Sequence, residues 1–168
     1  MLSTSQASID STRSSPGRAI LIGGLVSGVL DITAAFVVYG AFGLGPVALL
    51  HGIAAGIYGA TRSHGGGLAT AALGLLCHFL IAFAAAAVFV LASRILPILA
   101  RIPLLFGPIY GIAVYFFMQF AVLPLTAIAQ HPTPLKFVLI GCAIHILCVG
   151  VPIALITARL APAKPPTP

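Results

Sequence analysis

The sequence contains very few charged side chains, and almost none of them is acidic. Only 6% of its 168 residues are charged, and Asp10 and Asp31 are the two acidic residues. Soluble domains carry about a quarter charged residues. A soluble fold of this length could not bury the 60% of residues that are hydrophobic. The composition therefore predicts that the chain is embedded in lipid.

The scarcity of acids also excludes several kinds of chemistry. Asp10 lies in the N-terminal segment, far from Asp31, so a catalytic pair of carboxylates is excluded. There is no Ser/His/Asp order, no phosphate-binding loop and no His-Glu-x-x-His motif. The three cysteines, an odd number inside apolar runs, imply small hydrophobic side chains rather than a disulfide framework. No enzymatic activity is predicted.

Four apolar runs are each long enough to cross a bilayer, which takes about 20 helical residues. The predicted spans are 19–42, 68–93, 104–128 and 137–158. The first run exceeds the roughly 7–15 apolar residues of a signal peptide, so it is expected to remain as a span. The sequence thus predicts an all-α membrane protein, an antiparallel four-helix bundle over residues 18–160. The flanking segments 1–17 and 161–168 are predicted to be a disordered tail and a Pro-rich tail.

A further apolar segment, 46–60, could be a fifth span or a short helix at the membrane surface. With four spans, the side that holds both termini carries six basic residues and the other side carries two; five spans would give four against four. The six are Arg13, Arg18, Arg94, Arg101, Arg159 and Lys164, and the two are Arg62 and Lys136. The positive-inside rule therefore favours four spans, cytoplasmic termini and an interfacial helix at 46–60 on the outer face.

The net charge of +6 has the same explanation. The basic residues indicate the orientation of the chain in the membrane and contact with anionic lipid head groups, rather than a binding site for nucleic acid. The bilayer is thus the predicted partner, and association with other membrane proteins or a second copy stays open.

An internal repeat is visible in the glycines and histidines of the spans. The first and third spans carry Gly24-x-x-x-Gly28 and Gly107-x-x-x-Gly111. The second and fourth carry Gly74-x-x-x-His78 and Gly141-x-x-x-His145. Gly-x-x-x-Gly motifs allow close helix packing. The pattern predicts two similar two-span units related by an axis along the membrane normal.

Each span contributes one polar side chain near mid-membrane: Asp31, His78, Gln119 and His145, with Tyr115 one turn before Gln119. At 1.5 Å per residue, all four lie within roughly 5 Å of the midplane. An ionisable group at this depth costs a few kcal/mol and normally faces the bundle interior, where it finds a partner. We therefore predict that these side chains converge inside the bundle.

Four interpretations of this polar layer remain open. It is a hydrogen-bond cluster that fixes helix register, or a proton- or ion-coupled pathway in which Asp31 and a histidine exchange a proton. It is a transition-metal site of His78, His145 and Asp31, with Cys148 as a further ligand, or a b-type haem held between the two histidines. The predicted function is a transport component or accessory subunit without a cofactor, and the alternative is a redox module that binds metal or haem. His51, His64 and His131 are expected to be solvated loop histidines.

Several short motifs resemble those of a group of small bacterial inner-membrane proteins. They are Leu30-Asp31-Ile32, His78-Phe79, Leu123-Pro124-Leu125, and His145 followed by Gly150-x-Pro152. More remotely, the chain is similar to the YagU-like inner-membrane family of unknown function. The resemblance covers about residues 18–160. It implies a bacterial inner-membrane location and carries no activity.

Overall fold

The computed structural model of the chain describes residues 15–127 and 133–161. Most of both predicted tails, residue 128 and His131 lie outside this part. The described residues are almost entirely helical and contain no strand. Four helices are long and apolar enough to cross a membrane, Pro16–Gly40, Gly67–Ile95, Pro103–Leu125 and Leu135–Leu160. The prediction of an all-α four-helix membrane bundle is confirmed.

The four spans differ in regularity. The first, α2 (Pro16–Gly40), and the second, α5 (Gly67–Ile95), are continuous α-helices. The third starts as α7 (Pro103–Phe117) and continues as π-helical η1 (Met118–Val122) and 3₁₀-helical η2 (Leu123–Leu125). The fourth consists of α8 (Leu135–Ile144), π-helical η3 (His145–Gly150) and α9 (Val151–Leu160). In both irregular spans a proline follows the π-helical segment closely and cannot donate a backbone hydrogen bond.

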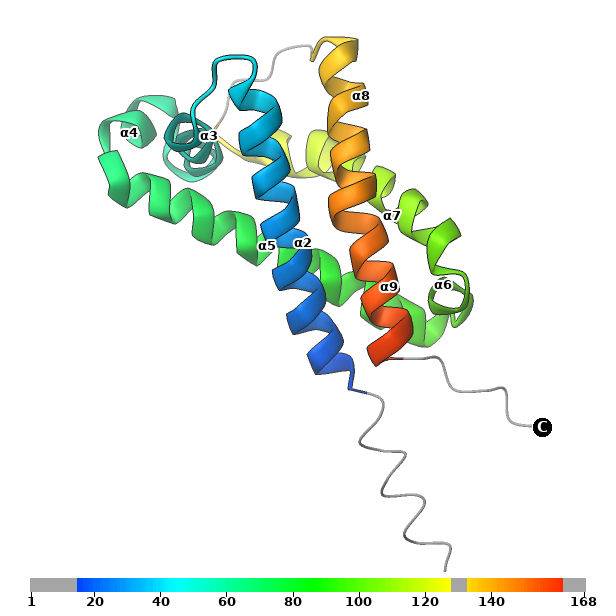
Figure 1. Cartoon of the computed structure of the whole chain (residues 1–168). Helices are drawn as coiled ribbons and strands as arrows, with labels where there is room; N and C mark the ends of the chain where they lie inside the picture. Colours follow the sequence, from blue (N-terminus) through cyan, green and yellow to red (C-terminus); the bar gives the residue numbers. More distant parts are fainter. Residues whose placement is uncertain (1–14, 128–132, 162–168) are drawn as a thin grey trace, which may run out of the picture.

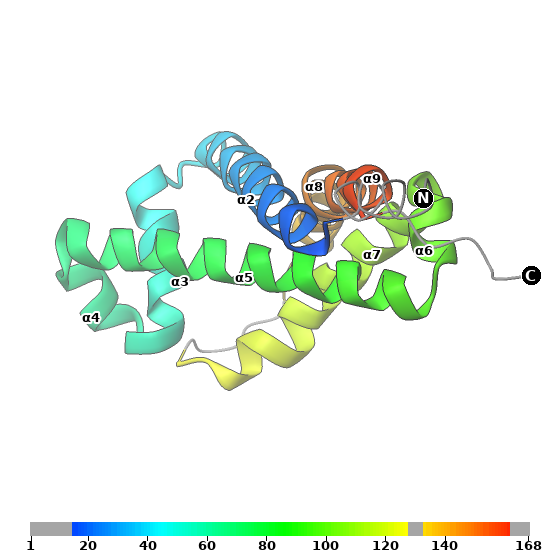
Figure 2. The same cartoon turned by 90° about the horizontal axis from the view of Figure 1, so that it is seen from below.

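The beginning and end of the described chain meet at one end of the bundle. Helix α2 starts with Ser15 as N-cap, whose hydroxyl accepts from the Arg18 amide, and Pro16 occupies the first helical position. The Ser15 amide donates to the Leu160 carbonyl at 2.9 Å. Figure 1 shows α2 beside α8 and α9, with α5 crossing obliquely. Figure 2 shows α5 lying across the bundle between α2 and α7. Its 29 residues make a helix about 43 Å long. This length exceeds the thickness of the hydrocarbon core, so α5 must tilt to lie within the membrane.

The opposite end is covered by two short helices, α3 (Pro46–Tyr58) and α4 (Ala60–Gly65). Figure 1 shows α3 end-on beside the first part of α5, on which it packs. It occupies the segment 46–60 that was expected to be a surface helix. The Ser63 hydroxyl donates to the His51 carbonyl at 2.6 Å, and His51 Nε2 donates to the Gly67 carbonyl at 2.8 Å.

His51 is therefore not a solvated loop histidine, and that prediction is wrong. Its side chain is buried because α3 and α4 fold back over the start of α5 and enclose it. His64 is exposed, as expected.

Close backbone approaches at glycines determine which spans touch. A Cβ at Gly24 or Gly28 would overlap the ring of Phe83 or Phe79 on α5. A Cβ at Gly107 would lie 2.9 Å from Val151 Cα on α9. In each predicted unit, the glycine pair thus faces the next span, as helix packing through small residues requires.

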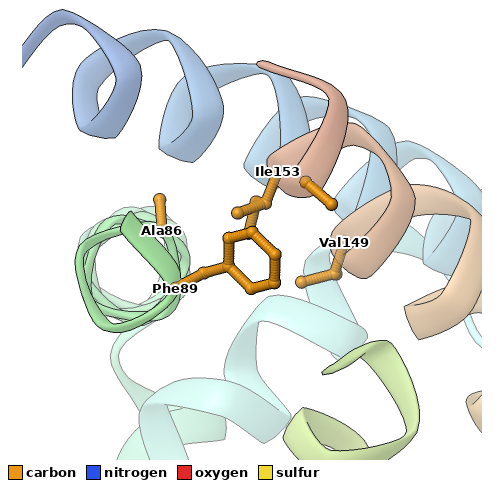
Figure 3. Packing of buried hydrophobic residues seen from close by; sticks show 5 residues of the cluster. Ala86, Phe89, Val149 and Ile153 are labelled. Atoms are coloured by element: carbon orange, nitrogen blue, oxygen red, sulfur yellow. The ribbon is translucent and has the colours of Figure 1, made fainter. Parts of the chain in front are cut away.

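The apolar core lies between these contacts. Phe89 of α5 packs against Ala86, Val149, Ile153 and Ala154 (Figure 3). These side chains join α5 to the last span on the inner side of the bundle. Large apolar side chains elsewhere on the spans are exposed, as expected for surfaces that face lipid.

We expect Gly111→Ala to destabilise the bundle. A Cβ there would lie 2.5 Å from the His145 carbonyl oxygen and 2.7 Å from Ile146 Cα, and overpacking of this kind costs about 1–3 kcal/mol. The matched control is Gly52→Ala, inside α3, where a Cβ meets nothing within 4 Å and alanine favours the helix by about 1 kcal/mol. Thermal unfolding in detergent, followed by circular dichroism, should give a lower Tm for the Gly111 variant alone. Equal Tm values for the two variants would contradict the packing described.

Candidate functional site

The site starts from the close contact between α2 and α5. Because Gly24 and Gly28 have no side chains, the two backbones approach closely there. His78 on α5 thereby reaches across to α2, and its Nε2 lies 2.9 Å from the Gly28 carbonyl oxygen. A carbonyl only accepts hydrogen bonds, so Nε2 must be the donor. Nδ1 of His78 then carries a hydrogen only when the ring is a cation.

That second nitrogen faces the one acidic residue of the spans. His78 Nδ1 and Asp31 Oδ2 are 3.9 Å apart, and their side chains are 12% and 17% exposed. The distance is too long for a direct hydrogen bond and just within the separation of an ion pair. Asp31 Oδ1 is buried and has no hydrogen-bond partner. The carboxylate therefore has an unsatisfied acceptor next to a histidine nitrogen.

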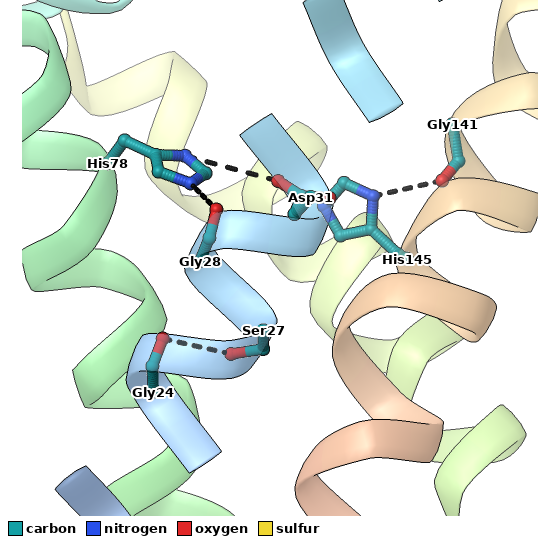
Figure 4. Close-up of polar contacts among 7 residues, drawn as sticks. All are labelled: Gly24, Ser27, Gly28, Asp31, His78, Gly141 and His145. Carbon is teal, nitrogen blue, oxygen red and sulfur yellow. Dashed lines mark hydrogen bonds and ion pairs between the residues drawn. The ribbon is translucent and has the colours of Figure 1, made fainter. Parts of the chain in front are cut away.

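His145 approaches the same place from the last span. It begins the π-helical segment η3, and its Nδ1 donates to the Gly141 carbonyl at 2.9 Å. The same argument leaves its Nε2 without a hydrogen unless the ring is charged. Figure 4 shows the His145 ring extending from its helix on the side of Asp31. π-helical turns widen a helix locally and are frequent at functional sites.

These three side chains line one cavity of about 110 Å³. The other lining residues are Ser27, Ile53, Ile81, Ala82, Ala85, Val114, Met118 and Val149. The Ser27 hydroxyl donates to the Gly24 carbonyl of its own helix, so it does not supply a hydrogen to Asp31. With both histidines neutral, Asp31, His78 and His145 present three acceptors to the cavity. The arrangement therefore favours a bound proton, water or ligand with hydrogen-bond donors.

Two more titratable side chains lie within electrostatic reach of Asp31. Tyr39 is on the same helix and Cys148 is on η3. Tyr39 was not singled out from the sequence, although its spacing of eight residues from Asp31 places both on one face of a helix. Cys148 is a free thiol, and Cys77 and Cys142 are free as well.

Gln119 does not join the other three predicted residues. It lines a separate hollow of about 530 Å³ at the C-terminal end of α2. Its side-chain amide donates to the Tyr115 hydroxyl at 3.3 Å. Val114 and Met118 are the residues of this span that face the cavity. Tyr115 and Gln119 come one residue after Val114 and Met118. Each therefore points about 100° farther around the helix axis, away from the cavity. Tyr115 separates the hollow from the cavity, since its ring packs against the His145 ring at 5.4 Å.

The geometry does not favour a metal or haem. Within residues 15–127 and 133–161, no three His, Cys, Asp or Glu side chains are grouped in a way that could hold a metal ion. The cavity is also well below the roughly 300–1,000 Å³ of typical ligand pockets, and a macrocycle needs more room between His78 and His145.

We expect Asp31→Asn to insert and fold with a Tm close to that of the original chain. Oδ1 has no hydrogen bond to lose, and Oδ2 makes none with His78. His78→Leu, by contrast, removes the bond to the Gly28 carbonyl and should cost about 1 kcal/mol. His64→Leu is the control for the same change of side chain, because the bond from His64 Nδ1 to the Ala60 carbonyl is exposed and water can replace it. Thermal unfolding of the three variants measures the differences. A large loss of stability in Asp31→Asn would instead make Asp31 a structural hydrogen-bonding residue.

Comparison with known proteins adds no family to this description. No family model, curated protein or solved structure matches the chain. The resemblance to the YagU-like family stays a prediction. The functional conclusion therefore rests on the geometry of the cavity around Asp31.

Proposed function

We propose that this chain is a proton-coupled transport component of a membrane, with Asp31 and His78 as its proton site. One observation carries the proposal: Asp31 Oδ2 and His78 Nδ1 face each other at 3.9 Å in a mostly enclosed site. The neutral His78 ring carries its hydrogen on Nε2, so Nδ1 is free to take up a proton. A single proton on this pair gives either a neutral acid beside a neutral ring or an ion pair. Both forms have zero net charge, which suits a group inside a bilayer.

An acid and a histidine in this arrangement can share one proton. The opposite charge of a protonated ring favours an ionised carboxylate, whereas desolvation disfavours it. The proton therefore belongs to the pair rather than to one residue. A group that gains and loses a proton within a membrane is the minimal element of proton coupling.

The surroundings supply few competing charges. The titratable groups that face Asp31 are His78 from α5, His145 and Cys148 from η3, and Tyr39 from α2 itself. Helices α3 and α7 contribute only apolar side chains to the cavity. The proton site thus contains one acid and two histidines.

We also infer a bacterial inner-membrane location with both termini in the cytoplasm. The described basic residues Arg18, Arg94, Arg101 and Arg159 are on the segments that meet near the chain ends, and Arg62 and Lys136 are on α4 and α8 at the other end (Figure 1). The positive-inside rule supports this orientation.

The orientation is tested with a C-terminal reporter. Alkaline phosphatase fused after residue 168 should be inactive, and a fluorescent protein at the same place should fluoresce, because the former folds outside the cytoplasm and the latter inside. The same reporters inserted after Gly65, at the end of α4, should give the opposite result. An active phosphatase at the C-terminus would overturn the topology.

The proton site is tested by infrared difference spectroscopy on the full chain in lipid. Asp10 and Asp31 are the only acidic side chains, so the carboxyl band of Asp31 is unusually easy to assign. We expect a reversible band of a protonated carboxyl group, coupled to an imidazole band, when the pH is varied over the range in which the chain stays folded. Both should disappear in Asp31→Asn and persist in Asp10→Asn. If Asp31 keeps one protonation state over this range, the proton-coupling proposal fails.

A metal- or haem-binding redox module is the alternative. It draws on one observation: the bond from His145 Nδ1 to the Gly141 carbonyl orients the ring as bonds behind metal ligands do. Purification separates the two functions. A Soret band, or metal bound in stoichiometric amount, would select the redox module over the transport component.

A further inference from the structure

An apolar groove lies beside the proton site, between α5 and α7. These two spans both line the cavity, yet they scarcely pack on each other, whereas α2, α5 and the last span are in extensive contact. The groove has a volume of about 530 Å³, within the usual size of a ligand pocket. Apart from Tyr110, its lining consists of apolar side chains of α5, α7 and η1, among them Ala84, Ala113 and Met118.

The inner end of the groove is closed by a specific contact. The Tyr110 hydroxyl donates to the Ala85 carbonyl at 2.7 Å, and the Tyr110 and Phe89 rings pack at 4.9 Å. Ala84 and Ala113 farther along are exposed. The groove is therefore open on the side of the bundle where lipid would lie, and it is bounded toward the end that carries the chain termini.

The groove and the polar cavity share a wall. Ile81, Ala85, Val114 and Met118 line both. Met118 lies at the start of the π-helical segment η1, and an unbranched methionine side chain readily changes its rotamer. Of the four shared residues, Met118 has the most flexible side chain, and its movement would connect the groove with the space beside Asp31.

We propose that the groove and the cavity together bind a lipid-soluble primary amine in its ammonium form, taken from the bilayer. The inference rests on the proposed function and names the substrate class of the same site. The apolar body of the amine occupies the groove between α5 and α7, and its ammonium group occupies the cavity.

The acceptors in the cavity support this head group. An ammonium has three N–H donors and no acceptor, and the cavity presents three acceptors, on Asp31, His78 and His145. Asp31 also supplies the opposite charge that a cation needs inside a membrane. A bare metal cation fits less well, because alkaline-earth ions require about six or more oxygen ligands.

Proton coupling follows from the charges. The empty pair holds one proton and is neutral. When the ammonium binds, its charge replaces that of the proton: Asp31 is ionised, His78 is neutral, and one proton is released. His145 and Cys148 from η3 and Tyr39 from α2 stay neutral in this exchange. Amine and proton therefore compete, and their movement in opposite directions carries no net charge across the membrane.

Calorimetry on the full chain in lipid nanodiscs tests the proposal with 1-adamantylamine as the probe. The neutral 1-adamantanol has the same apolar body and is the matched control ligand. We expect saturable binding of the amine and the release of one proton per amine bound. Because amine and proton compete, the apparent Kd should fall about tenfold for each unit by which the pH is raised, as long as the pair holds its proton. The alcohol should bind at least tenfold more weakly at high pH. Equal affinities for amine and alcohol, or a Kd independent of pH, would overturn the proposal.

Three variants distinguish the contribution of the groove from that of the proton site. Asp31→Asn should abolish proton release and saturable binding. Ala113→Phe fills the groove from a residue that does not line the cavity, so it should weaken amine binding at least tenfold and leave the infrared titration of Asp31 unchanged. Ala143→Phe, at an exposed alanine of α8 outside the groove, is its matched control and should bind as the original chain does.

The outcomes distinguish this proposal from the one on which it rests. A normal infrared titration of Asp31 without amine binding refutes the amine and leaves the proton site intact. If the original chain shows no infrared titration of Asp31, the proton site itself is refuted. If Ala113→Phe changes only the oligomeric state, measured by light scattering, a second copy of the chain covers the groove and the amine proposal is wrong. Unchanged amine binding in Ala113→Phe also refutes it, since the groove then holds only lipid.

Discussion

The site depends on the absence of two side chains. Gly24 and Gly28 let α2 lie against the Phe79 and Phe83 rings of α5 so closely that a single methyl group would overlap them. Only at that separation does His78 reach the Gly28 carbonyl, and this bond determines which ring nitrogen holds the permanent hydrogen. The tautomer of the neutral His78 ring is therefore set by helix packing and a backbone carbonyl rather than by a second polar side chain.

A second close approach shapes the other half of the site. Gly107, Gly111 and Gly150 bring the third and fourth spans together at backbone distance, and the π-helical turn that starts at His145 adjoins this contact. Helix α2 packs closely on both α5 and the last span, and α7 packs closely on the last span. Helices α5 and α7 have no comparable contact with each other, so the seam between them stays loosely packed. The cavity and the groove lie along this seam.

The sequence predicts the spans well and the site in part. Long apolar runs dominate hydropathy, so the four spans are placed to within three residues at each described end. The glycine pairs and the polar depth layer lead to Asp31, His78 and His145. Depth says nothing about direction around a helix, which is why Gln119 is found in another hollow. His51 is missed for a related reason: the α3–α4 fold that buries it depends on contacts with α5 that leave no periodic pattern. The two π-helical turns have no simple sequence pattern either.

The bond between the Ser15 amide and the Leu160 carbonyl has a consequence for biosynthesis. The start of the first span is held by the end of the fourth span, which leaves the ribosome after the other three. Asp31, in contrast, finds His78 in the very next span to be made. The contact between Asp31 and His78 thus needs only the first two spans, whereas the contact at Ser15 needs the fourth. A hairpin of α2 and α5 already places a histidine beside the acidic residue of the first span, as an ionisable group inside a membrane requires.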